Sequence, residues 1–313
     1  MPEVVDRLAR GARVAVVRLR SLGDCVLSTP ALQLLKAHRP DLRVAVVVEP
    51  AWRAVYEGNP DVDEILEPSL SALWRFAPDL VLNLHGGARS ARLVAASRAR
   101  WRAGFAHFRN AWLYNVPIPR AQEILGEERT VHTAEHAASA MFCLGVPVAE
   151  IPRARLFVSR KVERRRPYAV IHPLASAAEK TWAAERFAES ARWIERELGL
   201  EAVIIGAAGD DLNAFAEFAR VQGAPLEEVK GLIAGAEIFL GNDSGPAHMS
   251  AALGVPVVVL FGPMDPAIWG PWRVESEVRR PEKGLRELPV EQVTEALAKL
   301  RARTAAQAGR QPA

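Results

Sequence analysis

The residue best suited to acid–base chemistry near the start of the sequence is Asp24, which follows Arg20, Ser21 and Gly23 in a short polar stretch. It lies where an apolar run gives way to helical signals. A carboxylate there can cap the free N–H groups of the helix, and the spacing by itself favours that role. An ionised carboxylate that faces a ligand can instead act as a general base toward a hydroxyl nucleophile. The residues alone leave both roles open.

A second candidate is Lys180, which lies in a loop of small residues that includes Ser176 and precedes an amphipathic helix. Small residues let a loop approach a ligand closely, and a lysine ammonium can hold a point positive charge against phosphates. A lysine at the start of a helix interacts unfavourably with the helix dipole. A purely structural role for Lys180 is therefore less favoured, but it stays open.

The third candidate is the element Gly-Asn-Asp-Ser-Gly-Pro-Ala-His at residues 241–248. Glycines, a hydroxyl and a new helix N-terminus can present several N–H donors to a pyrophosphate. Asp243 or Ser244 can also simply cap that helix, with Pro246 in its first turn. His248 can donate to phosphate oxygens or pack one turn into the helix.

These candidates follow short apolar runs that alternate with segments of helical character. Continuous runs rich in β-branched residues suit strands covered on both faces, which predicts parallel sheets flanked by helices, the α/β doubly wound pattern. The runs form two series: 14–17, 44–48 and 80–84, then 168–171, 202–205, 238–240 and 257–261. In such sheets ligands bind at the carboxyl ends of the strands, where the candidate residues lie.

The domain organisation follows from the same pattern. The charged stretch 158–167 has no apolar periodicity and ends in a proline, so we expect the interdomain linker there. The predicted domains are residues 1–158 and 159–288. Residues 289–313 are predicted to form a C-terminal helix with a tail that frays from Arg301 onward.

Composition excludes several classes of protein. No run of 18 or more apolar residues suits a membrane span, and the first residues lack the pattern of an export signal, so we expect a cytoplasmic protein. The cysteines Cys25 and Cys143 form no bridge framework, and no Cys/His spacing suits a metal. Neither a Gly-x-Gly-x-x-Gly turn nor a P-loop is present, and no nucleic-acid-binding motif accompanies the net charge of +3.

One segment is strongly basic. Residues 85–120 contain no Asp or Glu but seven arginines, among them Arg89 and Arg92. Such a segment either attracts an anionic ligand or surface or forms an ordinary solvated helix.

The motifs can be compared with known families when they are taken together and in order. Ser-Leu-Gly-Asp, His-Pro-x-Ala-Ser with Lys-Thr-Trp, Gly-Asn-Asp-Ser-Gly-Pro-Ala-His and a closing Leu-Phe-Gly-Pro-Met-Asp-Pro resemble glycosyltransferase family 9, the ADP-heptose:lipopolysaccharide heptosyltransferases. The stretch Asn-Leu-His-Gly-Gly at residues 83–87, with Ser90, matches as well. The resemblance covers about residues 13 to 273.

The resemblance implies a GT-B fold, in which two Rossmann-like domains face each other across a cleft, and an inverting transfer without a metal or other cofactor. It implies ADP-heptose or a related nucleotide sugar as donor and an anionic lipopolysaccharide-core acceptor at the cytoplasmic face of the inner membrane. It makes Asp24 the base, against the preference for a cap. It assigns donor contacts to Ser176, Lys180, Asp210, Asp243, Ser244, Gly245 and His248. The basic segment, with Arg89 and Arg92, would suit the acceptor.

The sequence also departs from the family pattern. Leu174 and Ala183 replace a common glycine and proline, and residues 218–226 lack the usual apolar strand beside the adenine. Two other functions remain open: a nucleotide-sugar epimerase of the same fold, and a binding module that has lost catalysis and recognises an anionic glycolipid.

Overall fold

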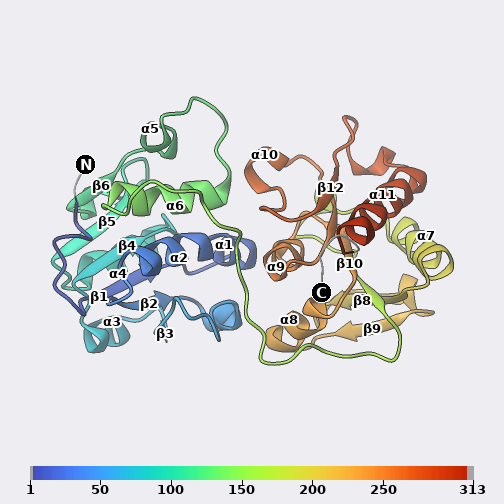
Figure 1. Cartoon of the computed structure of the whole chain (residues 1–313), viewed down its shortest axis with the longest axis horizontal. Helices are drawn as coiled ribbons and strands as arrows, with labels where there is room; N and C mark the ends of the chain where they lie inside the picture. Colours follow the sequence, from blue (N-terminus) through green and yellow to red (C-terminus); the bar gives the residue numbers. More distant parts are fainter. Residues whose placement is uncertain (1–2, 309–313) are drawn as a thin grey trace. The chain divides into compact units, whose positions relative to one another are not determined.

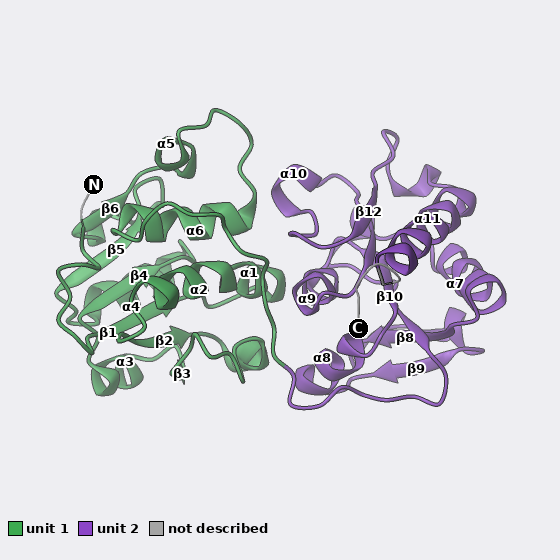
Figure 2. Cartoon of the chain, in the orientation of Figure 1, with its two compact units in different colours: residues 1–157 green, residues 158–313 purple. Residues whose placement is uncertain are grey.

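The computed structural model describes residues 3–308 and consists of two compact units (Figure 2). The division falls between Phe157 and Val158, next to the boundary expected from the charged linker. Each unit has its own parallel sheet and its own core.

The first unit is a six-stranded parallel sheet in the order β3-β2-β1-β4-β5-β6, with helices packed against it (Figure 1). Its central strands are valine- and leucine-rich and buried on both faces, as predicted from their continuous apolar runs. The strands are β1 (Arg13–Val17), β2 (Arg43–Val47), β3 (Glu64–Leu66), β4 (Leu80–Asn83), β5 (Trp101–Phe105) and β6 (Val116–Ile118). The helices are α1 (Leu22–Leu27), α2 (Thr29–His38), α3 (Leu70–Phe76), α4 (Ala88–Ala96), α5 (Ala121–Leu125) and α6 (Thr133–Cys143).

The second unit repeats this topology with the order β12-β11-β10-β7-β8-β9, again all parallel. Its strands are β7 (Tyr168–His172), β8 (Glu201–Gly206), β9 (Ala219–Gln222), β10 (Ile238–Asn242), β11 (Val257–Leu260) and β12 (Ser276–Arg279). Its helices are α7 (Ala184–Trp193), α8 (Leu226–Ala234), α9 (Gly245–Leu253), α10 (Pro266–Trp269) and α11 (Val290–Ala308). Both sheets are therefore doubly wound, and the strand order reverses between β1 and β4 and between β7 and β10.

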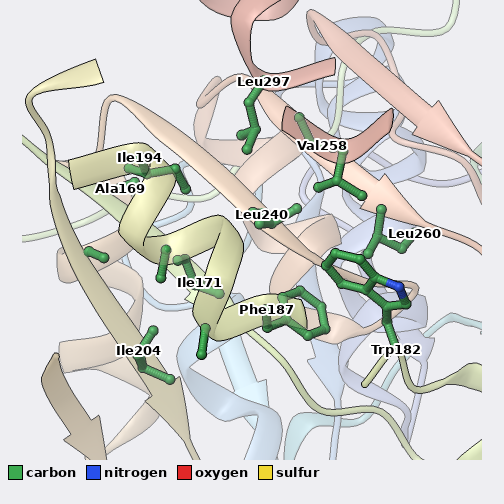
Figure 3. Close-up of a cluster of buried hydrophobic side chains, with 14 of the residues drawn as sticks. Ala169, Ile171, Trp182, Phe187, Ile194, Ile204, Leu240, Val258, Leu260 and Leu297 are labelled. Carbon is green, nitrogen blue, oxygen red and sulfur yellow. The ribbon is translucent and has the colours of Figure 1, made fainter. Parts of the chain in front are cut away.

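The core of the second unit also anchors the loop that carries Lys180. The ring of Trp182 is buried against Phe187, with ring centroids 4.9 Å apart, among side chains of β7, β10 and β11 (Figure 3). Its indole N–H donates to the carbonyl oxygen of Leu288 over 3.0 Å. A buried tryptophan with a satisfied N–H fixes a loop strongly, because removing it would cost about 3–5 kcal/mol.

The structure changes two expectations about the second unit. Residues 218–226 do contain a strand, β9, which pairs with β8 at the edge of the sheet. Its residues alternate between half-buried and exposed because the strand is at an edge, so it shows no apolar run. This segment therefore differs from the family pattern in its amino-acid composition, but it still forms a strand.

The second correction concerns the tail. The final helix does not fray at Arg301 but continues to Ala308. Ion pairs hold this part, since Arg301 binds Glu237 over 2.8 Å and Arg303 binds Glu275 over 3.3 Å. Residues 309–313 of the expected tail lie outside the described residues. Across residues 3–308, no helix is both long and apolar enough to cross a membrane.

Candidate active site

Both sheets place their candidate residues at the same topological position. In an open parallel sheet the carboxyl ends of the strands form one edge, and ligands bind where the strand order reverses. In the first unit that edge carries the loop after β1, with Asp24, and the loop after β4. In the second unit it carries the loop after β7, with Lys180, and the loop after β10, with Asp243.

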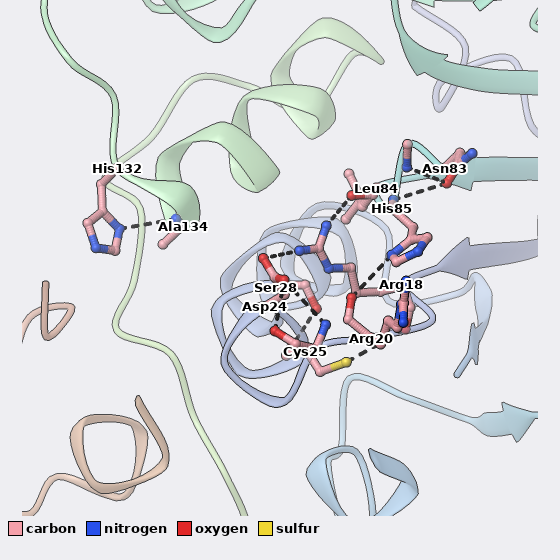
Figure 4. Close-up of polar contacts among 12 residues, drawn as sticks. Arg18, Arg20, Asp24, Cys25, Ser28, Asn83, Leu84, His85, His132 and Ala134 are labelled. Atoms are coloured by element: carbon pink, nitrogen blue, oxygen red, sulfur yellow. Dashed lines mark hydrogen bonds and ion pairs between the residues drawn. The ribbon is translucent and has the colours of Figure 1, made fainter. Parts of the chain in front are cut away.

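Asp24 is held in the first turn of α1 and is fixed on both carboxylate oxygens (Figure 4). Its Oδ2 accepts from the backbone N–H of Ser21 over 3.2 Å and from the Ser21 hydroxyl over 3.0 Å. Its Oδ1 forms an ion pair with the guanidinium of Arg18. The carboxylate therefore does contribute to the helix start, as the spacing suggested. It also keeps 20% of its side chain exposed, which is compatible with contact to a ligand.

The loop after β4 is built around Asn83, which is completely buried. Its amide Nδ2 donates to the hydroxyls of Ser90 over 3.1 Å and Tyr114 over 2.7 Å. Its Oδ1 accepts from the backbone N–H groups of His85 and Gly86. A buried polar side chain with all its hydrogen-bonding groups satisfied fixes a single loop conformation.

His85 joins the two loops of this edge (Figure 4). Its Nδ1 lies 3.1 Å from the carbonyl oxygen of Arg20, so that nitrogen carries the proton and donates. Burial, followed by the nearby charge of Arg18, lowers the pKa of His85. The imidazole beside Asp24 is thus neutral near pH 7.

In the second unit, Lys180 and Asp243 come together from loops 63 residues apart in sequence. The distance from Lys180 Nζ to Asp243 Oδ2 is 3.4 Å, which is longer than the contacts around Asp24 that have normal lengths. Burial raises the pKa of Asp243, and the ammonium of Lys180 opposes this rise. Lys180 is therefore a partly exposed cation with a loose partner, able to turn toward an anionic ligand.

Asn242 connects the loops that carry these two charges. It is completely buried; its Oδ1 accepts from the backbone N–H of Trp182 over 3.1 Å, and its Nδ2 donates to the carbonyl of Pro173 over 2.9 Å. The lysine loop is thereby tied at both ends to the last residue of β10. The neighbouring Gly262 must be a glycine, because a Cβ there would lie 2.3 Å from the carbonyl oxygen of Glu179.

Ser244 stands at the N-cap position of α9 but its side chain makes no capping hydrogen bond. Its hydroxyl lies instead 3.1 Å from Nδ1 of His172, the last residue of β7. Burial lowers the pKa of His172 to about 4, so its ring is neutral near pH 7. Gly245 begins the helix, and His248 is buried in its first turn. The open end of α9 and this polar pair suit a phosphate.

Two predicted donor residues take less prominent places. Ser176 is exposed in the loop before Lys180. Asp210 follows β8, and its Oδ2 accepts from the backbone N–H of Ala207 over 2.6 Å, which closes the turn there. The charge of Asp210 nevertheless acts on His172, the partner of Ser244.

The basic segment does not form one patch. Arg98 and Arg100 precede β5 at the amino edge of the sheet and stack over Trp74 and Trp101, at 4.4 and 5.1 Å from the ring centroids. Arg89 and Arg92 lie at the start of α4, after β4, on the carboxyl edge. Both are exposed, and Arg89 pairs with Glu49. The topology divides the segment, so only part of its charge lies on the edge with Asp24.

A hollow of about 730 Å³ in the second unit lies at the opposite edge of the sheet, beside Tyr168 at the start of β7. Two arginines that line it are already paired, Arg164 with Glu201 over 2.6 Å and Arg301 with Glu237 over 2.8 Å. It does not contain the residues of the candidate site.

Three residues of this geometry were not predicted from the sequence. Asn242 and His172 lie within motifs and Arg18 lies three residues before one, but no local pattern says what their side chains bind. A usable signal was that each is a polar residue at the end of a predicted central strand. Such positions are next to the ligand edge.

Comparisons with known proteins identify the family of the chain. The protein-family model described as glycosyltransferase family 9 (heptosyltransferase) matches residues 71–288, which is more than half of the chain. Lipopolysaccharide heptosyltransferase 3 of Escherichia coli K12 is 25% identical over 336 residues, with 90% of this chain and 96% of that protein covered.

Solved structures share the fold. The family 9 glycosyltransferase of Veillonella parvula superposes with a TM-score of 0.82 at 23% identity and covers 93% of this chain and 97% of its own. The Escherichia coli heptosyltransferase WaaC with ADP gives 0.78 at 20% identity, with 92% and 99% covered. The two doubly wound sheets are thus those of the GT-B architecture, and the chain belongs to glycosyltransferase family 9 and is a glycosyltransferase enzyme.

Proposed function

We propose that this enzyme transfers a heptose from ADP-heptose to an inner-core lipopolysaccharide acceptor, with inversion and without a metal. The observation that carries the proposal is the distribution of charge in a family 9 chain. The fixed carboxylate of Asp24 lies at the ligand edge of the first sheet. The loosely paired Lys180 and the N-terminus of α9 lie at the ligand edge of the second sheet. Relatives named as lipopolysaccharide heptosyltransferases support the substrates.

In this mechanism Asp24 accepts the proton of the acceptor hydroxyl as that oxygen attacks the anomeric carbon. As the glycosidic bond breaks, negative charge builds on the departing nucleoside diphosphate. Lys180 and the N-terminus of α9 stabilise that charge, with Ser244 and His248 beside it. Inversion requires the base and the leaving group on opposite sides of the anomeric carbon, and we assign one to each unit.

The donor is tested by thermal shift with ADP-, UDP-, GDP- and CMP-linked sugars. A ligand that binds only the folded state raises the melting temperature, so ADP-heptose should give the largest rise. A larger rise with another nucleotide would refute the ADP assignment. Incubation of the donor without acceptor should return it unchanged, whereas an epimerised sugar would favour an epimerase.

The base is tested with Asp24→Asn. The transfer rate should fall about 10²- to 10⁴-fold while ADP affinity stays near wild type, because the amide cannot take the proton. Equal loss of both would make Asp24 a structural residue. Binding across the donor panel without any turnover by the wild type would point to a module that has lost catalysis.

The proposal also places the enzyme in the cytoplasm, in peripheral contact with the inner membrane that holds its acceptor. Support comes from the exposed Arg89 and Arg92 on the ligand edge and from Trp112, which is 80% exposed within the acid-free segment. Tryptophan and arginine suit an anionic interface. Sedimentation with phosphatidylglycerol vesicles should carry the wild type down and Trp112→Ser less. Equal sedimentation with phosphatidylcholine would contradict the electrostatic part.

A further inference from the structure

Asp24 forms an ion pair with Arg18, to which the proposed function assigns no role. We infer that Arg18 is a positioning residue for the transfer reaction: it holds the Asp24 carboxylate in the orientation in which it receives the acceptor proton. This inference rests on the proposed role of Asp24.

Arg18 bridges three elements of the first unit (Figure 4). It follows the last residue of β1, its Nη1 donates to the carbonyl oxygen of Leu84 after β4, and its Nη2 pairs with Oδ1 of Asp24 in α1. Its side chain is only 14% exposed. A guanidinium is planar, so satisfying the carbonyl and the carboxylate together fixes the angle between them.

The cap at the start of α1 does not need this arginine. The hydrogen bonds that close the helix use Asp24 Oδ2 with the N–H and hydroxyl of Ser21. The pair with Arg18 uses the other oxygen, Oδ1. A purely structural carboxylate would be complete with the first set. The second restrains the rotation of the carboxylate about its side-chain bond, and this matters when a proton must be received at a defined atom.

Arg18 also contributes to the electrostatics of two nearby histidines. After burial, its charge is a cause of the lowered pKa of His85, and after burial and His107 it contributes to that of His136 on α6. Both imidazoles are therefore neutral near pH 7, and the positive charge next to His85 belongs to Arg18 and Arg20.

The test compares Arg18→Gln and Arg18→Lys with the wild type by steady-state kinetics. Glutamine should lower kcat about ten- to a hundredfold, the range expected for a lost charge-assisted hydrogen bond, while ADP affinity by thermal shift stays unchanged. Lysine keeps the charge but is a single point that cannot satisfy Leu84 and Asp24 together, so its kcat should lie between glutamine and wild type.

Arg155→Gln is the matched control, because Arg155 pairs with Asp61 over 3.0 Å in the same unit without touching either loop of the site. Its kcat should remain near wild type. If Arg18→Gln does not fold, Arg18→Lys decides, and wild-type kcat in that variant would overturn the inference.

Asp24→Asn, measured beside them, separates the two proposals. If Asp24→Asn is active, the base assignment fails and this inference fails with it. If Asp24→Asn is inactive and Arg18→Gln keeps wild-type kcat, only the role of Arg18 is refuted. A parallel fall in kcat and ADP affinity for Arg18→Gln would also refute it, since that pattern marks general damage.

Discussion

Each unit places an aspartate beside a cation where its central strands end: Asp24 with Arg18 in the first, and Asp243 with Lys180 in the second. The first pair comes from one stretch of seven residues and is completed by Ser21. The second joins distant loops over 3.4 Å, and burial raises the pKa of its carboxyl. A planar guanidinium suits a fixed partner, and a flexible ammonium suits a partner that can be exchanged.

The same topology can therefore present either a carboxylate or a cation as the functional group. In the first unit the carboxylate is the functional group and the cation orients it. In the second unit the cation is the functional group and the carboxylate holds it near the helix N-terminus, where a diphosphate would bind. Substitutions at equivalent positions of the two units should therefore have different effects.

The largest difference is expected at the two buried asparagines that support the loops. Asn242→Leu leaves the N–H of Trp182 and the carbonyl of Pro173 without a partner, at a cost of about 2–4 kcal/mol in the free energy of unfolding. Asn83→Leu should cost less, about 1–2 kcal/mol, because the Ser90 hydroxyl keeps its bond to the Gly87 carbonyl and the loop N–H groups are half-buried.

Urea unfolding of both variants measures this difference. Equal losses would show that the two loops are supported equally and would remove this part of the contrast. The control is Asn115→Ala, because Asn115 is exposed and lies before β6, away from the carboxyl ends of the strands. This substitution should change the free energy of unfolding little.

The next effect concerns the cation of the second unit. Lys180→Met should weaken ADP binding about ten- to a hundredfold, since a charge-assisted contact to the diphosphate is lost, whereas Asp24→Asn should leave it unchanged. Isothermal titration with ADP measures both. Lys36→Met breaks a similar lysine–aspartate pair, with Asp63 at 2.9 Å, and should bind like wild type. Normal ADP affinity in Lys180→Met would end its assignment as the donor cation.

The two units should differ least in the dependence of their stability on pH, because both contain a buried neutral histidine. Burial is the main cause that lowers the pKa of His172 and of His136 to about 4, compared with 6.5 for an ordinary histidine. The unfolded chain therefore binds protons first, and the stability contributed by each neutral ring is lost as pH falls from about 6.5 toward 4. At pH 5 the loss is about 2 kcal/mol for each ring.

Denaturation at pH 7.5 and pH 5 tests this sign. His172→Asn and His136→Asn should each be less sensitive to acid than the wild type. Arg18→Gln should also reduce the loss of stability in acid that comes from His136, because the charge of Arg18 helps to lower the pKa of that histidine. The loss of stability in acid that comes from His172 should not change. A wild-type acid response in His172→Asn would contradict the buried neutral ring.

Much of the fold could be predicted from the sequence because the central strands are continuous apolar runs. The valine-rich runs at β1, β2 and β11 could be recognised because both faces of each strand are covered. Five strands were not predicted, because none of them contains four apolar residues in a row: β3, β5, β6, β9 and β12. The final helix was predicted too short because ion pairs, and not apolar spacing, hold its last turns.

The candidate site was predictable in its residues but not in its contacts. Asp24, Lys180 and Asp243 stood out because each follows a predicted strand with glycines or small residues nearby. Their partners did not stand out. The hydroxyl of Ser244 was one of two candidates to cap α9, but it contacts His172, which lies 72 residues earlier in the chain.

The sequence by itself determined two parallel sheets and the loops that carry charge, because hydrophobic periodicity and glycine placement act locally along the chain. The tertiary structure decided which charges meet. That choice depends on strand order, which makes β1 a neighbour of β4 and β7 a neighbour of β10. Only then can Arg18 reach Leu84, and Lys180 reach Asp243, since side-chain contacts act over a few ångströms whatever the separation in sequence.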